Sequence, residues 1–262
     1  MKLVRIRHGQ KNSFGMLRNG QVELLSAPPY EENARPTGET IPFENVQLLA
    51  PTDPPDIWAV GLNYRDHARE SGRDAPGRPV FFLKANSSIN HPGGTITLPD
   101  IAPDEVDLEA ELAVVIGKTA RRIRPADVPE HVLGYTCAND VSARDCQLRL
   151  DQQWARGKSF DSFCPLGPWI ETDLDPRNLH IASRLNGTTI QEAHTGLMIF
   201  DCADLVAQLS DCATLLPGTV ILTGTPAGVG VARKPPLFLK PDDVVEIEIE
   251  GIGTLRNQVQ PE

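Results

Sequence analysis

Residues 106–117 read VDLEAELAVVIG, and the remainder of the chain can be interpreted from this stretch. Three carboxylates, Asp107, Glu109 and Glu111, alternate with apolar residues and lead into an uninterrupted apolar run. This pattern is typical of a strand that leaves solvent and enters a core. Side chains two residues apart on a strand share a face, with Cα atoms about 6.5–7 Å apart. Glu109 and Glu111 are therefore close enough to lean toward one cation, and two anions beside a core are costly without one. A Glu-x-Glu pair alone more often lines a solvated edge.

Composition limits the class of protein. The chain has 262 residues, 40% of them hydrophobic and 23% charged, which is enough for a full core. No apolar run is long enough to cross a bilayer, and the N-terminus MKLVRIR alternates like a strand and lacks the apolar block of a signal peptide. The net charge of −10 argues against nucleic acid or an anionic membrane as partner. The five cysteines form no C-x-x-C pair, so we predict a protein of the reducing cytoplasm.

The chain is predicted to divide near residue 50. Residues 14–17 and 22–25 flank Asn19-Gly20 and predict a hairpin. The sequence PTDPP at 51–55 then breaks regular structure. We expect a small N-terminal domain at 1–50 and a larger domain at 51–262. Strands outnumber helices without a regular βαβ rhythm, which favours a β-rich α+β fold over a doubly wound sheet.

Polar residues cluster where predicted strands end. A buried strand at 57–60 precedes a helix over 63–70, with Asn63 as candidate N-cap and with His67 and Glu70 on one face. Residues 71–79 form either a lid or, more commonly for such composition, a surface loop. Asp140, after a strand at 135–139, is a third candidate carboxylate ligand. Other predicted elements are strands at 81–84, 95–98, 220–222 and 245–250 and helices at 125–132 and 202–209.

Two nucleotide-binding motifs are excluded. Gly157-Lys158-Ser159 resembles the end of a phosphate-binding loop, but Gln152 stands where that motif requires glycine. Residues 224–230, GTPAGVG, contain no G-x-G-x-x-G. We interpret this segment as a tight turn or as backbone that approaches a small ligand closely.

Several short motifs follow one another in order between about residues 57 and 257. The motifs are Gly61-Leu62-Asn63-Tyr64 with Asp66-His67, Asp107-x-Glu109-x-Glu111-Leu112, 139–145 (NDVSARD), 157–161 (GKSFD), 165–169 (PLGPW), Asn186-Gly187, 223–230 (TGTPAGVG) and Gly251-Ile252-Gly253. Together these motifs resemble the fumarylacetoacetate hydrolase family. The resemblance implies a mixed β-sandwich roll with a small N-terminal α/β domain. It also implies a homodimer.

The family also implies roles for individual residues. It implies that Glu109, Glu111 and Asp140 bind Mg²⁺ or Mn²⁺, which prefer oxygen ligands; Ca²⁺ could replace either in a crystal. The positions of His67 and Glu70 match a water-activating dyad, and that of Lys158 matches a residue that holds or protonates an enolate. Substrate-contacting positions match Tyr64, Arg144, Gln147 and Thr225. We expect Arg144 and Lys158 to form a local positive patch for a small anionic 2-oxo acid.

The resemblance leads to a specific hypothesis of function. The expected enzyme is a divalent-metal-dependent hydrolase that cleaves a C–C bond of a 2,4-dioxo acid, of acylpyruvate or diketo-deoxy sugar acid type, through a metal-bound enolate. The alternatives are an oxaloacetate decarboxylase and a 2-hydroxyhepta-2,4-diene-1,7-dioate isomerase, since both reactions pass through the same enolate. A third alternative is a non-catalytic protein that keeps the fold and binds a metal or ligand. The presence of both His67 and Glu70 argues against a pure binding protein.

Overall fold

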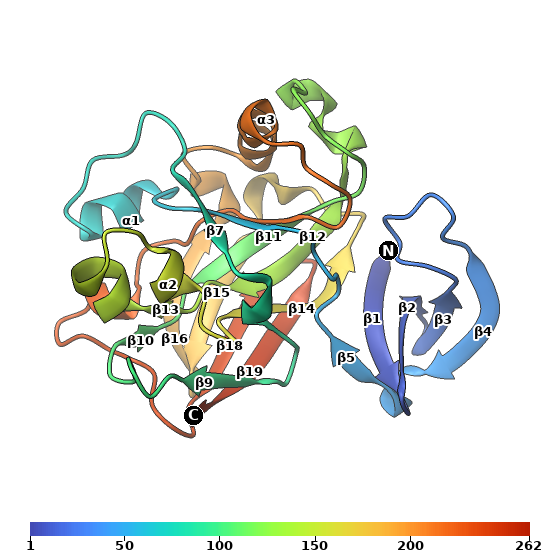
Figure 1. The fold of residues 1–262 in the computed structure, drawn as a ribbon, viewed down its shortest axis with the longest axis horizontal. Coiled ribbons are helices and arrows are strands. Elements are labelled where there is room, and N and C mark those ends of the chain that lie inside the picture. Colours follow the sequence, from blue (N-terminus) through green and yellow to red (C-terminus); the bar gives the residue numbers. More distant parts are fainter.

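The computed structural model describes residues 1–262, and strands make up most of its regular structure (Figure 1). The main path of a twelve-stranded sheet runs in the order β4 (Pro36–Pro42), β3 (Gln21–Leu25), β2 (Lys11–Arg18), β1 (Lys2–His8), β14 (Cys164–Glu171), β12 (Val132–Asn139), β11 (Ala110–Ile116), β17 (Val220–Leu222), β6 (Ile57–Val60) and β7 (Phe81–Lys84). Strand β5 (Gln47–Leu49) pairs with β1, and β8 (Ile89–Asn90) pairs with β14.

A second sheet has the order β16 (Thr188–His194), β15 (His180–Leu185), β18 (Val244–Ile249), β19 (Gly253–Pro261) and β9 (Thr95–Leu98). A short pair joins β10 (Val106–Asp107) to β13 (Ser142–Ala143). The α-helices are α1 (Arg65–Glu70), α2 (Ala155–Lys158) and α3 (Cys202–Cys212), with a π-helix at Cys146–Leu150 and 3-10 segments between. The β-rich fold class is confirmed. No helix combines the length and the apolar character that a membrane span needs.

Strand β11 explains why the sequence after Glu111 is continuously apolar. Its residues Leu112, Val114 and Ile116 belong to the largest apolar cluster, together with residues of β15, β18, β19 and α3. The alternate residues Ala113 and Val115 belong to a second cluster, with residues of β6, β14 and β17. Because both faces of β11 are buried, the strand has no polar face. The strand therefore fixes its carboxylate-bearing start against the core.

The first fifty residues add strands to the edge of the large sheet (Figure 1, blue). The predicted hairpin is confirmed: β2 and β3 pair around Asn19 and Gly20, whose φ angles of 48° and 72° suit a tight hairpin turn. Strand β1 pairs with β14 through Lys2–Glu171 and Leu3–Ile170. The helical content between residues 1 and 50 is one 3-10 turn at Phe43–Asn45, so strands build this unit, which was expected to contain helices as well.

One predicted helix has a different form. Residues Pro125–Glu130 form a 3-10 helix, and β12 already begins at Val132. Pro129 lies inside the segment, and proline lacks the N–H that an α-helix interior requires. The predicted short helix over 125–132 is therefore present as a 3-10 helix that ends two residues earlier.

Candidate active site

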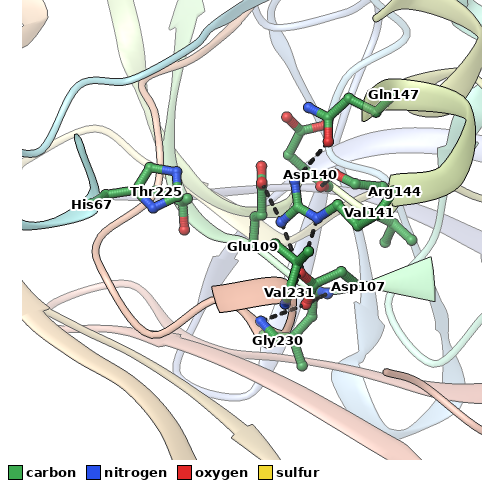
Figure 2. Close-up of polar contacts among 12 residues, drawn as sticks. His67, Asp107, Glu109, Asp140, Val141, Arg144, Gln147, Thr225, Gly230 and Val231 are labelled. Carbon is green, nitrogen blue, oxygen red and sulfur yellow. Dashed lines mark hydrogen bonds and ion pairs between the residues drawn. The ribbon is translucent and has the colours of Figure 1, made fainter. Parts of the chain in front are cut away.

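A cavity of about 260 Å³ opens beside the start of β11. Its walls come from residues in 60–73, Phe82, 109–111, 144–158 and 225–232. His67, Glu70, Glu109, Glu111, Arg144, Gln147, Lys158 and Thr225 all line it. The structure therefore brings together residues that are up to 158 positions apart (Figure 2).

The three predicted metal ligands form a buried group. One carboxylate oxygen from each of Glu109, Glu111 and Asp140 lies within 4.8 Å of the others. The expected continuous strand is broken at Leu108 and Glu109, between β10 and β11. The backbone N–H of Glu109 donates instead to Asn139 Oδ1 at 2.9 Å, and that of Asp140 donates to the Glu109 carbonyl at 3.0 Å. This break lets Asp140 approach the glutamates from the neighbouring strand.

Two buried lysines hold the carboxylates. Lys158 Nζ lies 2.6 Å from Glu109 Oε2 and 2.6 Å from Asp140 Oδ2. Lys84 Nζ lies 2.5 Å from Asp140 Oδ1 and has a fully buried side chain. Sequence reasoning missed Lys84, although it is a lysine at the end of a predicted apolar strand, which is a weak indication of a buried partner. Asp140 therefore lies between two ammonium groups.

Arg144 is bound by three neighbouring side chains (Figure 2). Its guanidinium lies 2.9 Å from Asp107 through Nε, 2.8 Å from Glu109 through Nη2 and 2.8 Å from the Gln147 side chain through Nη1. Asp107 also accepts backbone N–H groups of Gly230 at 2.8 Å and Val231 at 3.0 Å. Sequence analysis gave Asp107 no role in the site. Its carboxylate joins Arg144 to the glycine-rich segment on the cavity wall.

The arrangement of charge shifts several pKa values. Burial raises the pKa of Glu111 well above its ordinary value, and the Asp140 and Glu109 carboxylates raise it further. Burial acts on Glu109 in the same direction, but Lys158 and Arg144 outweigh it and hold the pKa of Glu109 well below its ordinary range. Burial lowers the pKa of Lys158, yet Asp140 and Glu109 raise it more. Lys158 is therefore an ammonium group at neutral pH.

The charges of the cluster fit a bound cation. The cluster consists of the carboxylates Asp107, Glu109, Glu111 and Asp140 and the cations Lys84, Arg144 and Lys158, all of them buried. Negative groups thus exceed positive groups by one when all are ionised. Glu111 makes no ion pair and accepts only the Gly224 N–H, at 2.6 Å. A hard divalent cation would supply the missing positive charge and accept oxygen ligands of this kind.

Helix α1 carries the predicted dyad on the opposite wall. His67 Nδ1 and Glu70 Oε1 are 2.7 Å apart. Glu70 also accepts the Gly228 N–H, at 3.1 Å and 2.9 Å from its two oxygens. A hydrogen bond from Nδ1–H to Glu70 leaves Nε2 free to accept a proton. The predicted proximity of His67 and Glu70 is confirmed.

Thr225 and Tyr64 have different positions relative to the cavity. The Thr225 hydroxyl lies on the cavity wall and donates to the Ala110 carbonyl at 2.9 Å, while Gln191 donates to it at 2.7 Å. Tyr64 is only 2% exposed, and its hydroxyl has no hydrogen-bond partner. It does not line the cavity. The structure therefore does not bring Tyr64 to the surface where a substrate would bind.

Asn63 has a role that the sequence did not reveal. It does not cap α1 with its side chain, and Tyr64 occupies the N-cap position. The fully buried Asn63 side chain donates to the carbonyls of Thr223 at 2.7 Å and Phe200 at 2.9 Å. Gly224, with φ of +95°, follows Thr223, and a Cβ there would lie 2.7 Å from Asn63 Cβ. Asn63 thus positions the turn whose N–H holds Glu111.

Comparison with known proteins places the chain in one family. The family model described as fumarylacetoacetate (FAA) hydrolase C-terminal matches residues 56–260. A model described as Rv2993c-like, N-terminal, matches residues 1–51. The rat protein named oxaloacetate tautomerase Fahd2a, mitochondrial, is 49% identical over 223 residues, which are 84% of this chain and 71% of the rat protein. The human oxaloacetate tautomerase FAHD2A, mitochondrial, is 49% identical over 224 residues, with the same two coverages.

Solved structures agree over the whole chain. The 5-carboxymethyl-2-hydroxymuconate delta-isomerase from Mycobacterium smegmatis is 42% identical, with a TM-score of 0.91 and 100% coverage of both chains. The 2-hydroxyhepta-2,4-diene-1,7-dioate isomerase from Mycobacterium marinum is 40% identical, with a TM-score of 0.89 and coverage of 100% of this chain and 99% of the other. The match over residues 56–260 and these identities lead to one conclusion. This chain belongs to the fumarylacetoacetate hydrolase family.

Proposed function

We propose that this chain is a divalent-metal-dependent enzyme that interconverts the keto and enol forms of a 2-oxo acid, with oxaloacetate as the first candidate substrate. The observation that carries the proposal is the pairing of two proton-transfer groups on one cavity. His67, bonded to Glu70, and Lys158, bonded to Glu109 and Asp140, both line it. The names of the rat and human relatives and of the two isomerase structures support this reaction class.

Glu109, Glu111 and Asp140 would hold Mg²⁺ or Mn²⁺. When bound, such an ion supplies positive charge that orients a 2-oxo acid and stabilises developing negative charge on its oxo oxygen. A divalent ion would also change the charge of the buried cluster from one excess negative to one excess positive. An anionic substrate is then electrostatically favoured even though the whole chain carries a net charge of −10.

His67 is the proposed base. Because Glu70 fixes Nδ1, the free Nε2 can remove a proton from the carbon next to the oxo group. The C–H electron pair then forms the C=C bond, and the C=O electron pair moves to oxygen. Glu70 keeps the ring in one orientation, and its second contact, with Gly228, anchors the helix that carries both residues.

Lys158 is the proposed acid. Its ammonium group donates a proton to the oxygen that gains the electron pair, which completes the enol. Burial lowers the pKa of Lys158, but Asp140 and Glu109 raise it more, so Lys158 holds its proton until a strongly basic oxygen forms beside it. One C–H bond is broken and one O–H bond is formed; His67 then releases the proton taken from carbon to solvent and Lys158 takes one up, so both groups are restored and no water is consumed. The reverse sequence converts enol to keto acid.

The test is the rate of approach to keto–enol equilibrium in freshly dissolved oxaloacetate, followed by the ultraviolet absorption of the enol. The wild-type protein with Mg²⁺ should accelerate this approach, and a chelator should remove the effect, which added Mn²⁺ or Mg²⁺ should restore. A rate equal to that of buffer with Mg²⁺ alone would refute the proposal.

C–C hydrolysis of a 2,4-dioxo acid is the second candidate, because the same His67–Glu70 pair could activate water. Decarboxylation of oxaloacetate and isomerisation of a 2-hydroxydienoate also need a site that stabilises an enolate. Release of pyruvate from acetylpyruvate would support hydrolysis, because a tautomerase breaks no C–C bond.

A homodimer remains our prediction for the assembly.

A further inference from the structure

The cavity contains three basic side chains, and two of them already have carboxylate partners. Lys158 contacts Glu109 and Asp140, and Arg144 contacts Asp107 and Glu109. The positive patch expected from Arg144 and Lys158 is therefore neutralised within the cluster. Arg73 is the third basic residue on the wall, and its guanidinium makes no ion pair or hydrogen bond. Its donors are available to a ligand.

The backbone of Arg73 is fixed even though its side chain is exposed. Helix α1 ends in a turn in which Gly72 N–H donates to the Arg69 carbonyl at 3.1 Å and Arg73 N–H donates to the Ala68 carbonyl at 2.9 Å. Gly72 has φ of +67°. These two bonds and the left-handed glycine are the Schellman motif, which places Arg73 two residues after the C-cap. Arg73 thus directly follows a defined capping turn, and its backbone N–H is part of that turn.

The chemistry of the neighbouring groups leaves Arg73 without an internal role. The position that Arg73 occupies in this motif is commonly apolar and packs back on the helix. Glu70 is three residues earlier, but its carboxylate is bonded to His67 and Gly228. Leu148, Trp154 and Val229 supply apolar parts of the wall. Among the three basic residues on the cavity wall, Arg73 alone has no carboxylate partner, so it is the residue available to bind a carboxylate at the far end of a substrate.

We propose that Arg73 binds the distal carboxylate of a 2-oxo dicarboxylate and so selects dicarboxylic over monocarboxylic 2-oxo acids. The proposal rests on the proposed function, because it assumes that the 2-oxo end of the substrate lies at the acidic cluster. A guanidinium can bind a carboxylate through two parallel N–H···O bonds. Lysine can offer only a point charge at this position, so it should replace Arg73 only in part.

Binding of two stable 2-hydroxy acids tests the assignment without turnover. Malate has a distal carboxylate and lactate has none, and both carry the 2-hydroxy acid end. Calorimetric titration with Mg²⁺ present should show that Arg73→Met weakens malate binding about tenfold to hundredfold, the range for a lost charged hydrogen bond. Lactate affinity should change less than about twofold, and Arg73→Lys should lie between wild type and Arg73→Met for malate. Arg78→Met, which removes the same charge from the same exposed segment outside the cavity, is the control and should leave both affinities unchanged.

Several results would overturn the proposal. Equal losses for malate and lactate would mean that Arg73 attracts anions in general. An unchanged malate affinity in Arg73→Met, or no preference of the wild type for malate over lactate, would mean that Arg73 does not contact the distal end. The two proposals can also be told apart. If the wild type fails to accelerate oxaloacetate tautomerisation but Arg73→Met shows the malate-specific loss, the proposed reaction is refuted and the Arg73 assignment stands. If the wild type accelerates tautomerisation but Arg73→Met shows no malate-specific loss, the Arg73 assignment is refuted and the proposed reaction stands.

Discussion

The two walls of the cavity are built in different ways. One wall consists of charged side chains buried between strands: Asp140 is fully buried and Glu109 is 5% exposed. The other wall is the six-residue helix α1, whose Glu70 reaches Gly228 and whose last turn leads into an exposed segment. Charges in the first wall are held by one another, and removal of one leaves its partners buried and unpaired. Groups in the second wall can be removed with little effect on the core.

The two walls therefore have different tasks: the strand wall binds charge, and the helix wall carries the base that transfers protons. The strand wall has to be preorganised, since buried ions tolerate little displacement. The helix wall carries the base and the proposed selectivity residue, and only His67 and Ala68 of the six residues of α1 are buried. We therefore expect substitutions in the strand wall to change stability and metal affinity together, while substitutions in α1 change rate or selectivity alone. Four predictions test this separation, from the largest effect to the smallest.

Asp140→Asn should have the largest effect. It removes the carboxylate that Lys84 and Lys158 share, so two buried ammonium groups lose a partner. Breaking a buried ion pair on one side costs about 3–5 kcal/mol. Urea unfolding should show this loss, and calorimetry should show no Mg²⁺ binding. Asp161→Asn, on an exposed aspartate, should change the unfolding free energy by less than about 0.5 kcal/mol. A variant as stable as wild type would show that the strand wall does not depend on its internal charge pairs.

His67→Ala should impair chemistry and leave the fold unchanged. Loss of a positioned general base lowers rates by about 10²–10⁴-fold. Tautomerisation, and hydrolysis if present, should fall by this factor, whereas oxaloacetate decarboxylation, which needs no base, should fall much less. Both activities and the urea midpoint should be measured on one preparation, with His8→Ala on β1 as the control. Equal losses of all activities would indicate that His67 shapes the cavity and does not transfer protons.

Glu111→Gln should change how stability depends on pH. In metal-free wild type the pKa of Glu111 is raised above its ordinary value of 4.5, so the folded state binds more protons than the unfolded state above that pH. Wild type should lose stability relative to Glu111→Gln as pH rises toward the raised pKa, by about 1.4 kcal/mol for each pH unit between the two pKa values. With Mg²⁺ the wild type should be more stable than Glu111→Gln, because the ionised Glu111 carboxylate then binds the cation. Urea midpoints of both proteins should be measured at pH 5 and pH 8, with chelator or with Mg²⁺. If the difference between the two midpoints in chelator is the same at both pH values, burial does not raise the pKa of Glu111.

Gly72→Ala should have the smallest effect. A left-handed conformation costs a residue with a Cβ about 1 kcal/mol relative to glycine. The variant should be destabilised by about that amount, and its malate affinity should fall less than that of Arg73→Met, because the turn that presents Arg73 is loosened. Gly77→Ala is a matched control, since Gly77 lacks a positive φ and has open space around it. If the two glycine variants behave alike, the helix end does not position Arg73.

The sequence predicted the parts of the site that depend on short-range pattern or on family motifs. Alternation before an apolar run identified Glu109 and Glu111, and the helical spacing of His67 and Glu70 correctly implied contact. The strand ends supplied Asp140. These residues lie together in the structure because each is placed by its own element, and the elements meet at one edge of the core.

Other parts of the site depend on contacts between distant segments. Lys84 meets Asp140 from 56 residues away, and Asn63 was interpreted as a helix cap because its partners, Thr223 and Phe200, lie far along the chain. Asp107 was a member of a motif without a role, since its partners are the backbone of Gly230 and Val231 and the side chain of Arg144. Residue type and spacing do not reveal such partners. The break at Leu108 and Glu109 likewise depends on the Asn139 side chain.

The bond from Glu70 to the Gly228 N–H has an evolutionary consequence. It ties α1 to the rest of the cavity through the backbone N–H of Gly228, a position that requires glycine because its φ is +107° and a Cβ there would lie 2.6 Å from the Ile190 carbonyl oxygen. The segment from Arg65 to Arg73, which leaves out the buried Asn63, can then be exchanged as one unit wherever the recipient keeps that glycine. Grafting this segment from a relative with another preference should transfer selectivity while the recipient retains its own cation affinity. Diversification of substrates within such a lineage could thus proceed through one short segment.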